Sequence, residues 1–238
     1  MSGLRPSTIK HYTTDARKFL EHYSGGPPSE VTPMHIRQYL ALLKQRVSAK
    51  TVYEVQLALR KFFRFLVDEG EIAGSPCDGI KLTRYRVDPQ PLYSLDEIKA
   101  LLASCDLKTP SGIRDYAIFM VLFDTGVRVG ELISMSPPDW KNRLVKVDGK
   151  TGVRYVPLGL SSLQALERYL RKWSVPDSPM WRGKYGPLTT SGVLQMVRRQ
   201  CSNFGIPYKV VHAFRWSAAA QMKRMGMNDS VRIINWAV

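Results

Sequence analysis

Apolar residues recur every three or four positions along most of the chain, which is the spacing of one face of an α-helix. In the first part of the chain this pattern predicts three helices, at residues 7–23, 32–46 and 48–70. Ser7 or Thr8 is expected to cap the first helix. Thr32 is the expected cap of the second helix, with Pro33 at its first helical position. Gly70 is the expected end of the third helix.

The second part continues the helical pattern with one interruption. The predicted helices cover residues 94–105, 112–126, 127–135, 161–173, 190–205 and 210–226. Ser94 and Glu97 have the spacing of a capping box, and Gly126 marks a helix end. Between these helices, residues 143–158 place β-branched residues on both sides of "DGKTG", which predicts a β-hairpin with a glycine-rich turn.

The regular pattern breaks between the two parts, where prolines, glycines and charges gather in residues 74–91. We expect irregular chain from about residue 81, with a linker at 85–92. This predicts a helical domain over 1–84 and a second domain over 93–238, which is mainly α with a small antiparallel β-sheet.

Charge narrows the range of partners. The net charge is +15, with 35 Lys and Arg against 20 Asp and Glu, and the pI is about 9.9. From Arg182 onwards there are nine basic residues and one acid, Asp229. A bias this strong favours a polyanion such as nucleic acid, whereas the plainer interpretation is that the charge only keeps the protein in solution.

Other chemistries have no support in the sequence. Cys77, Cys105 and Cys201 lie far apart and lack the spacing of a zinc site or a disulfide framework, so we expect reduced, structural thiols. The sequence has no nucleotide-binding glycine motif and no HExxH. It has no signal peptide pattern and no long apolar span, so a cytoplasmic protein that does not bind membranes is the default expectation.

Four positions in the second domain could hold an anion. Arg128 follows a glycine turn, with Glu131 one helical turn further on to orient its guanidinium. Lys150 is predicted at the hairpin tip, and His212 and Arg215 lie three apart on one helix face. Each has an ordinary alternative: a solvated Arg–Glu pair, a surface lysine, a core histidine and a locally paired arginine.

The surrounding motifs weaken those alternatives. "TGVRVGEL", "DGKTGVRYVPL" and "HAFRWSAAAQMKRMGM" resemble, in order and spacing, the three boxes of the tyrosine recombinase family, the phage integrases and Xer-type recombinases. "STIKHYTTDARKFL" and the segment from Ser48 to Pro76 resemble the helical, SAM-like core-binding domain of that family. The resemblance implies a core-binding domain followed by a tyrosine-recombinase catalytic domain.

The resemblance also implies roles. Arg128 and Arg215 would hold the non-bridging oxygens of a scissile DNA phosphate, because guanidinium groups stay charged and bind such oxygens bidentately. Lys150 would protonate the departing 5′ oxygen, and His212 would donate a hydrogen bond or accept the nucleophile's proton. No metal or cofactor is implied. The expected function is site-specific DNA recombination or integration on double-stranded DNA, by a tetramer that assembles on DNA from chains that are monomers alone.

The first domain offers a second set of candidates, for binding rather than catalysis. Basic or polar side chains on or before the third helix could follow a DNA backbone: Lys50, Thr51, Arg60, Lys61 and Arg64. The alternative is an amphipathic helix with a solvated face.

The sequence departs from the family at its end. The family's tyrosine nucleophile would lie beyond Val238, and Trp236 is two residues short of the preceding His or Trp position. Trp216 stands where the family often has His. We therefore expect a C-terminally incomplete catalytic domain that does not cleave DNA alone. The alternatives are a natural fragment that binds DNA without cutting it, a tyrosine supplied by a neighbour, or a type IB topoisomerase, which shares the chemistry.

Overall fold

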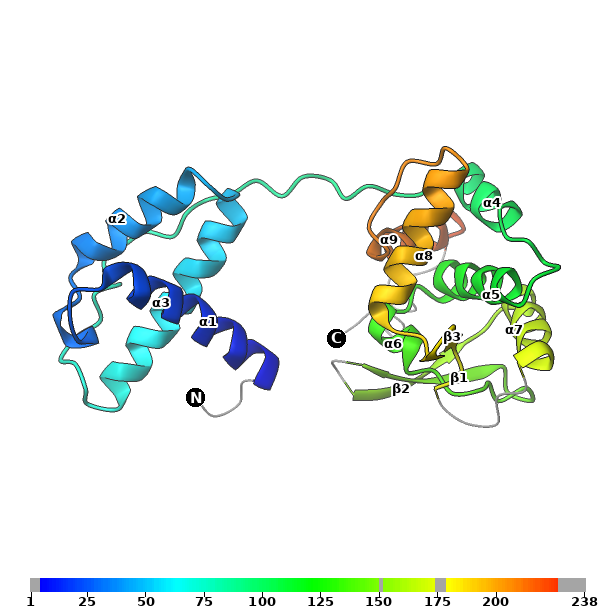
Figure 1. Ribbon diagram of the computed structural model, residues 1–238, viewed down its shortest axis with the longest axis horizontal. Coiled ribbons are helices and arrows are strands. Elements are labelled where there is room, and N and C mark those ends of the chain that lie inside the picture. Colours follow the sequence, from blue (N-terminus) through cyan, green and yellow to red (C-terminus); the bar gives the residue numbers. More distant parts are fainter. Residues whose placement is uncertain (1–4, 150–151, 174–178, 227–238) are drawn as a thin grey trace. The chain divides into compact units, whose positions relative to one another are not determined.

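The computed structural model describes residues 5–149, 152–173 and 179–226 (Figure 1). Lys150, Trp236 and Val238 lie outside the described residues. The chain divides into two compact units, Met1–Asp88 and Pro89–Val238. The division falls within the stretch where we expected the linker, and residues 80–94 contain no helix or strand.

The first unit is helical. Its elements are α1 (Pro6–Tyr23), the short 3-10 helix η1 (Pro28–Glu30), α2 (Pro33–Lys44) and α3 (Ala49–Asp68). Phe19 on α1 lies in the centre of the core, with its ring 5.3 Å from that of Tyr39 and 6.0 Å from that of Phe63. Beyond α3, the side chain of Gln56 binds the backbone of Lys81 and Thr83, which holds this return segment along the helix.

Most helix ends of this unit follow the sequence signals. The Thr32 side chain accepts the His35 N–H, and Gly70 has φ +77°, so both predictions are confirmed. The predicted cap of α1 is wrong, because Ser7 and Thr8 lie inside the helix and Arg5 is its N-cap. Pro6 takes the first helical position, where its fixed φ is favourable and its missing N–H costs nothing.

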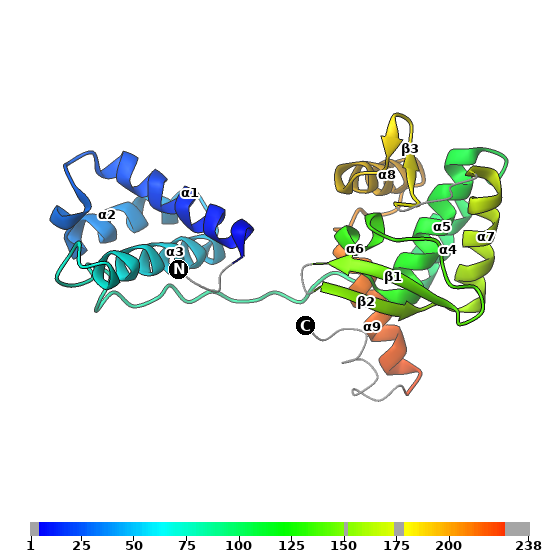
Figure 2. The ribbon, with the colours of Figure 1, turned by 90° about the horizontal axis from the view of Figure 1, so that it is seen from below.

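The second unit surrounds one buried helix. Its elements are α4 (Leu95–Ala103), α5 (Pro110–Thr125), α6 (Val129–Ile133), β1 (Leu144–Gly149), β2 (Gly152–Pro157), α7 (Leu160–Trp173), β3 (Arg182–Gly183), β4 (Gly186–Pro187), α8 (Thr190–Asn203) and α9 (His212–Arg224). Helix α5 packs against α4, α7 and α9, and Figures 1 and 2 show α7 running alongside it. Its buried residues Phe119 and Leu122 belong to a single core that does not include residues of the first unit. The predicted class, mainly α with a small antiparallel sheet, is confirmed.

The predicted hairpin is present as the antiparallel pair β1–β2, with Gly149 opposite Gly152 on either side of the tip. The sequence analysis missed a second antiparallel pair, β3–β4, whose strands have two residues each. Strands this short cannot show the alternation that identifies a strand in a sequence. Within the described part of the chain, no helix combines the length and the low polarity needed to cross a lipid bilayer.

Candidate functional site

A glycine turn begins the site. Helix α5 ends at Gly126, which has φ +60°, and α6 starts two residues later with Arg128 as its N-cap. A left-handed residue at this point is unfavourable for side chains with a Cβ, which explains why glycine is required. The turn therefore places Arg128 at the start of α6 and leaves the Gly126 carbonyl available to a neighbouring helix.

Glu131 is the buried centre of the cluster, with only 1% of its surface exposed. Its carboxylate accepts the Arg128 backbone N–H at 2.8 Å and the Arg128 guanidinium at 3.2 Å. It also accepts the Arg154 guanidinium at 3.0 Å. Burial alone would raise the pKa of Glu131, but the hydrogen bonds and positive charges of Arg154 and Arg128 outweigh burial and lower it.

Arg215 reaches the same cluster from α9. Its guanidinium donates to the Gly126 carbonyl at 2.8 Å, and the residue is 5% exposed. Burial, together with the charges of Arg128 and Arg154, lowers the pKa of Arg215 to about 10, although Glu131 acts in the opposite direction. The group stays protonated at neutral pH, so three positive charges face one negative charge in this cluster.

His212 is the first residue of α9 and is exposed to solvent. Burial lowers the pKa of His212, and the charges of Arg215 and Arg128 lower it further. The imidazole is therefore neutral at neutral pH and can accept a proton or donate its single N–H. Its ring meets that of Trp216, one turn along α9, edge-on at a centroid distance of 4.9 Å.

Arg154 is the cluster member that the sequence analysis missed. Along β2 the side chains alternate, so Arg154 faces Glu131 whereas Tyr155 lies exposed on the other face. Arg154 lies within the hairpin motif "DGKTGVRYVPL", but its partner Glu131 is 23 residues away.

The tip end of strand β1 packs closely on the same carboxylate. A Cβ added at Gly149 would lie 2.7 Å from Glu131 Cγ, closer than real Cβ atoms approach such an atom. Glycine at this position is therefore a packing requirement. The structure brings together Arg128, Glu131, His212 and Arg215, while the predicted fifth member, Lys150, follows Gly149 and lies outside the described residues.

The first-unit candidates do not form one surface. Lys50, Lys61 and Arg64 share one stripe of α3, since a helix turns by about 100° per residue, and all three are exposed. Lys50 and Arg64 pair with acids on the same stripe. Arg60 points elsewhere and donates to the Ile80 carbonyl, and the Thr51 hydroxyl lies 3.0 Å from that of Ser48 at the helix start.

The chemistry of this cluster suits an anion with several oxygens. Guanidinium groups bind such oxygens bidentately, and their charges do not depend on pH near neutrality. Among the residues that the structure describes, no three His, Cys, Asp or Glu side chains gather as a metal site would require.

Comparison with known proteins assigns the class. The phage integrase family profile matches residues 93–233, and the profile of the phage integrase N-terminal SAM-like domain matches residues 1–70. The chain belongs to the phage integrase family, whose members include the tyrosine recombinases.

Two relatives and one solved structure illustrate the match. Tyrosine recombinase XerD of Listeria monocytogenes serotype 4b (strain F2365) is 31% identical over 71% of this chain and 60% of its own length. Tyrosine recombinase XerC of Oceanobacillus iheyensis (strain DSM 14371 / CIP 107618 / JCM 11309 / KCTC 3954 / HTE831) is 32% identical over 88% of this chain and 75% of its own. A lambda integrase tetramer bound to a Holliday junction shares the fold, with a TM-score of 0.74 at 18% identity, over 97% of this chain and 71% of that one. The match to XerD thus spans about 60% of that relative's length.

Proposed function

We propose that the protein is a site-specific DNA recombinase or integrase that cuts and rejoins DNA through a 3′-phosphotyrosyl intermediate. One observation carries the proposal: Arg128, His212 and Arg215, from two separate motifs, converge around buried Glu131. The family membership of the chain supports the same chemistry.

In this proposal the two guanidiniums bind the non-bridging oxygens of one DNA phosphodiester. Negative charge grows on these oxygens as the nucleophile attacks phosphorus, so fixed positive charges stabilise the transition state more than the ground state. Neutral His212 accepts the nucleophile's proton or donates a hydrogen bond to the phosphate. Lys150, by resemblance, protonates the 5′ oxygen as its bond to phosphorus breaks.

We further infer that residues 1–238 do not cleave DNA by themselves. The last tyrosine in the sequence is Tyr208, before the third motif. Tyr169 is buried with its hydroxyl bonded to the Met180 carbonyl, and Tyr155 is on the face of β2 opposite Arg154. A tyrosine from a segment beyond Val238 or from a neighbouring subunit would supply the attacking oxygen.

Double-stranded DNA is the proposed substrate, bound by a tetramer, as in the lambda integrase assembly on a Holliday junction. The chain alone is expected to be a monomer, which light scattering after size-exclusion chromatography would measure. The exposed stripe of Lys50, Lys61 and Arg64 supports a backbone-binding role for α3.

Covalent trapping tests the catalytic part. Duplexes bound by the chain are first selected from a random library, and a nicked version that blocks religation is then incubated with the full gene product. Arg128→Ala and Arg215→Ala are each expected to lower the yield of covalent protein–DNA complex by at least ~100-fold. The control is Arg171→Ala, a change of the same type at an exposed side chain of α7. This variant should form the covalent complex normally.

Equal trapping by the Arg128 and Arg215 variants would contradict the catalytic assignment. A covalent complex formed by residues 1–238 alone would contradict the inferred need for an external tyrosine. Chelation with EDTA should leave trapping unchanged, because arginine and lysine supply the positive charge.

A second candidate is a DNA-binding protein that does not cut. The net charge of +15 supports DNA binding without requiring cleavage. A full gene product that binds the selected duplex in the nanomolar to micromolar range and never traps would support this function.

A further inference from the structure

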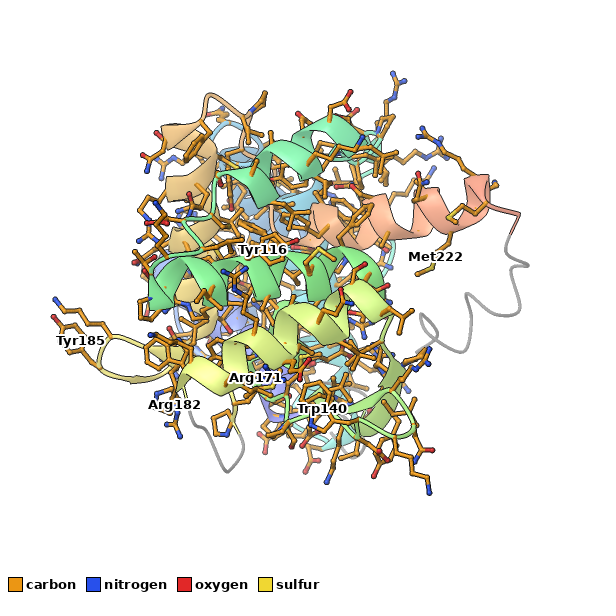
Figure 3. The ribbon with its side chains drawn as sticks, turned by 90° about the vertical axis from the view of Figure 1, so that its right-hand side faces the viewer. Tyr116, Trp140, Arg171, Arg182, Tyr185 and Met222 are labelled. Atoms are coloured by element: carbon orange, nitrogen blue, oxygen red, sulfur yellow. The ribbon has the colours of Figure 1, made fainter. Side chains whose placement is uncertain are left out.

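The β3–β4 hairpin projects from the second unit (Figure 3). Its two-residue tip is Lys184 and Tyr185, and Tyr185 is 91% exposed. The Lys184 ammonium lies 5.0 Å from the centre of the Tyr185 ring, and Arg182 stands at the root. The hairpin and the following helix, residues 179–203, contain four basic residues and no acid.

The root of this hairpin is held by buried groups. The Arg182 N–H donates to the Tyr169 hydroxyl at 2.8 Å, and the Arg182 carbonyl accepts from Arg114 at 2.9 Å. Next to it, Leu188 N–H donates to the carbonyl of fully buried Trp181 at 2.9 Å. Both sides of the hairpin are therefore attached to the core.

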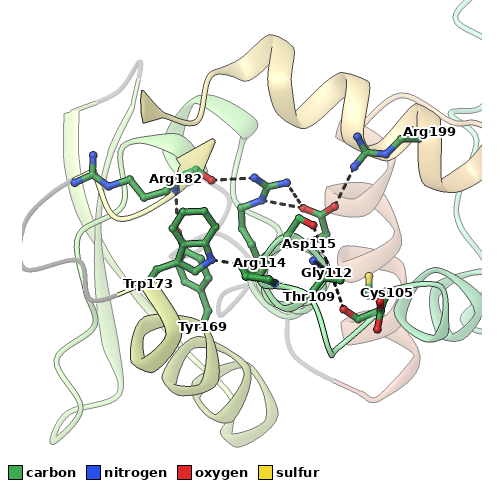
Figure 4. Close-up of polar contacts among 12 residues, drawn as sticks. Cys105, Thr109, Gly112, Arg114, Asp115, Tyr169, Trp173, Arg182 and Arg199 are labelled. Carbon is green, nitrogen blue, oxygen red and sulfur yellow. Dashed lines mark hydrogen bonds and ion pairs between the residues drawn. The ribbon is translucent and has the colours of Figure 1, made fainter. Parts of the chain in front are cut away.

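The Arg114 side chain that holds the hairpin root is itself held by charged groups (Figure 4). Asp115, 1% exposed, accepts two hydrogen bonds from Arg114, at 2.9 and 2.6 Å. Its other oxygen accepts from Arg199 on α8 at 3.3 Å. The hairpin root is thus tied through Arg114 and Asp115 to α5 and α8, and through Tyr169 to α7.

These contacts are needed because a hairpin with strands of two residues is too short to be stable alone. Gly186 adopts φ +135°, a conformation that glycine accepts, while the two tip residues stay out of that region. The tip can therefore carry Lys and Tyr without backbone strain. Because the root is held in place, the hairpin loses less backbone freedom when its tip binds a partner, which favours its use as a contact surface.

We propose that the β3–β4 tip, Lys184 and Tyr185 with Arg182 behind them, is an additional contact for the sugar-phosphate backbone of DNA, separate from the phosphate cleaved at the Glu131 cluster. Ammonium, guanidinium and phenol groups all donate hydrogen bonds to phosphate oxygens. A second copy of this chain is disfavoured as the partner, because its surface carries the same excess of positive charge. The inference rests on the proposed function, since DNA is taken as the ligand.

The test uses the chain as it exists, without cleavage. Affinity for a fluorescein-labelled 40-base-pair duplex of mixed sequence is measured by anisotropy over a series of KCl concentrations. The variant K184A/Y185A is expected to bind roughly eightfold more weakly at about 0.1 M salt, with the slope of log K against log[salt] smaller by about 0.9. K146A/Y155A is the matched control, because Lys146 and Tyr155 are exposed cross-strand partners on the other hairpin, β1–β2.

A second measurement is lysine acetylation followed by mass spectrometry. DNA should protect Lys184 and leave Lys146 reactive. Equal weakening by the two double variants, or no protection of Lys184, would overturn the inference while the proposed function stands. Protection that needs high protein concentration and no DNA would assign the tip to a protein interface and also overturn it. A chain with no salt-dependent affinity for any duplex would overturn both.

Discussion

Glu131 determines where the site's positive charges lie. A carboxylate that is 1% exposed loses nearly all its hydration, and its bonds to Arg128 and Arg154 compensate for that loss. In turn, both guanidiniums take their orientation from this one acid. Under the proposed function, the glutamate would act on catalysis through the arginines and is a positioning residue.

Replacing Glu131 should therefore cost stability as well as activity. Glu131→Ala is expected to lower the free energy of unfolding by about 3–5 kcal/mol, because buried arginine charge is left uncompensated. Urea unfolding measures this. The control, Glu167→Ala, breaks an exposed pair with Arg171 and should cost about 0–1 kcal/mol.

The loss at Glu131 should also depend on pH. Its pKa is lowered in the folded protein, so the stabilisation is fully present above the ordinary value of 4.5 and disappears as pH falls through the folded value. A difference between wild type and Glu131→Ala that stays constant through this acid range would contradict the buried-carboxylate account.

His212 gives a prediction about charge at the site. Because burial and the charges of Arg215 and Arg128 lower its pKa, the midpoint in the free protein should lie below 6.5. Arg215→Ala removes one of these charges and should raise the midpoint, whereas Arg224→Ala, later on the same helix, should not. Histidine NMR titration measures both, and an unchanged midpoint in Arg215→Ala would show that the two side chains do not interact.

At the scale of elements, the sequence predicted most of what local chemistry controls. The caps at Thr32 and Ser94 and the glycine ends at Gly70 and Gly126 all agree with the structure. These signals act within a few residues, so a single sequence contains them.

Features that depend on distant partners could not be predicted in the same way. Arg154 belongs to the site because its guanidinium binds Glu131, 23 residues away. The Arg60 guanidinium, predicted to contact DNA, donates to the Ile80 carbonyl, 20 residues away. The β3–β4 hairpin is held by Arg114 and Tyr169, which are at least 13 residues away in sequence. The motifs predicted Arg128, Glu131, His212 and Arg215 because each belongs to a recognisable box. The bond of Arg215 to the Gly126 carbonyl and that of Arg154 to Glu131 emerge only from the fold.

The β1–β2 hairpin should be sensitive to a single methyl group next to its tip, at Gly149. Gly149→Ala places a Cβ 2.7 Å from Glu131 Cγ, so the carboxylate or the strand must move. We expect a loss of about 1–3 kcal/mol in urea unfolding and weaker covalent trapping.

Gly130→Ala is the matched control on α6. A Cβ there meets nothing within 4 Å, and alanine favours helix over glycine by about 1 kcal/mol. This variant should therefore be as stable as wild type or more so. Equal behaviour of the two variants would argue against close packing between Gly149 and Glu131.

At the scale of the whole molecule, the chain contains two separate cores. The core of the first unit includes Phe19 and Phe63, that of the second includes Phe119 and Phe214, and no residue belongs to both. Residues 86–92 between them are exposed and without helix or strand. Each unit therefore has its own source of stability.

This organisation predicts that damage to one core stays local. Phe63→Ala should cost about 3–5 kcal/mol, and hydrogen exchange followed by mass spectrometry should show faster exchange in α1, α2 and α3 but not in α5 or α7. Phe119→Ala should give the reverse pattern, because both phenylalanines are fully buried in their own unit. If either substitution accelerated exchange equally in both units, the two cores would have to unfold together, and the separation of the helical first unit from the unit that holds the Glu131 cluster would be wrong.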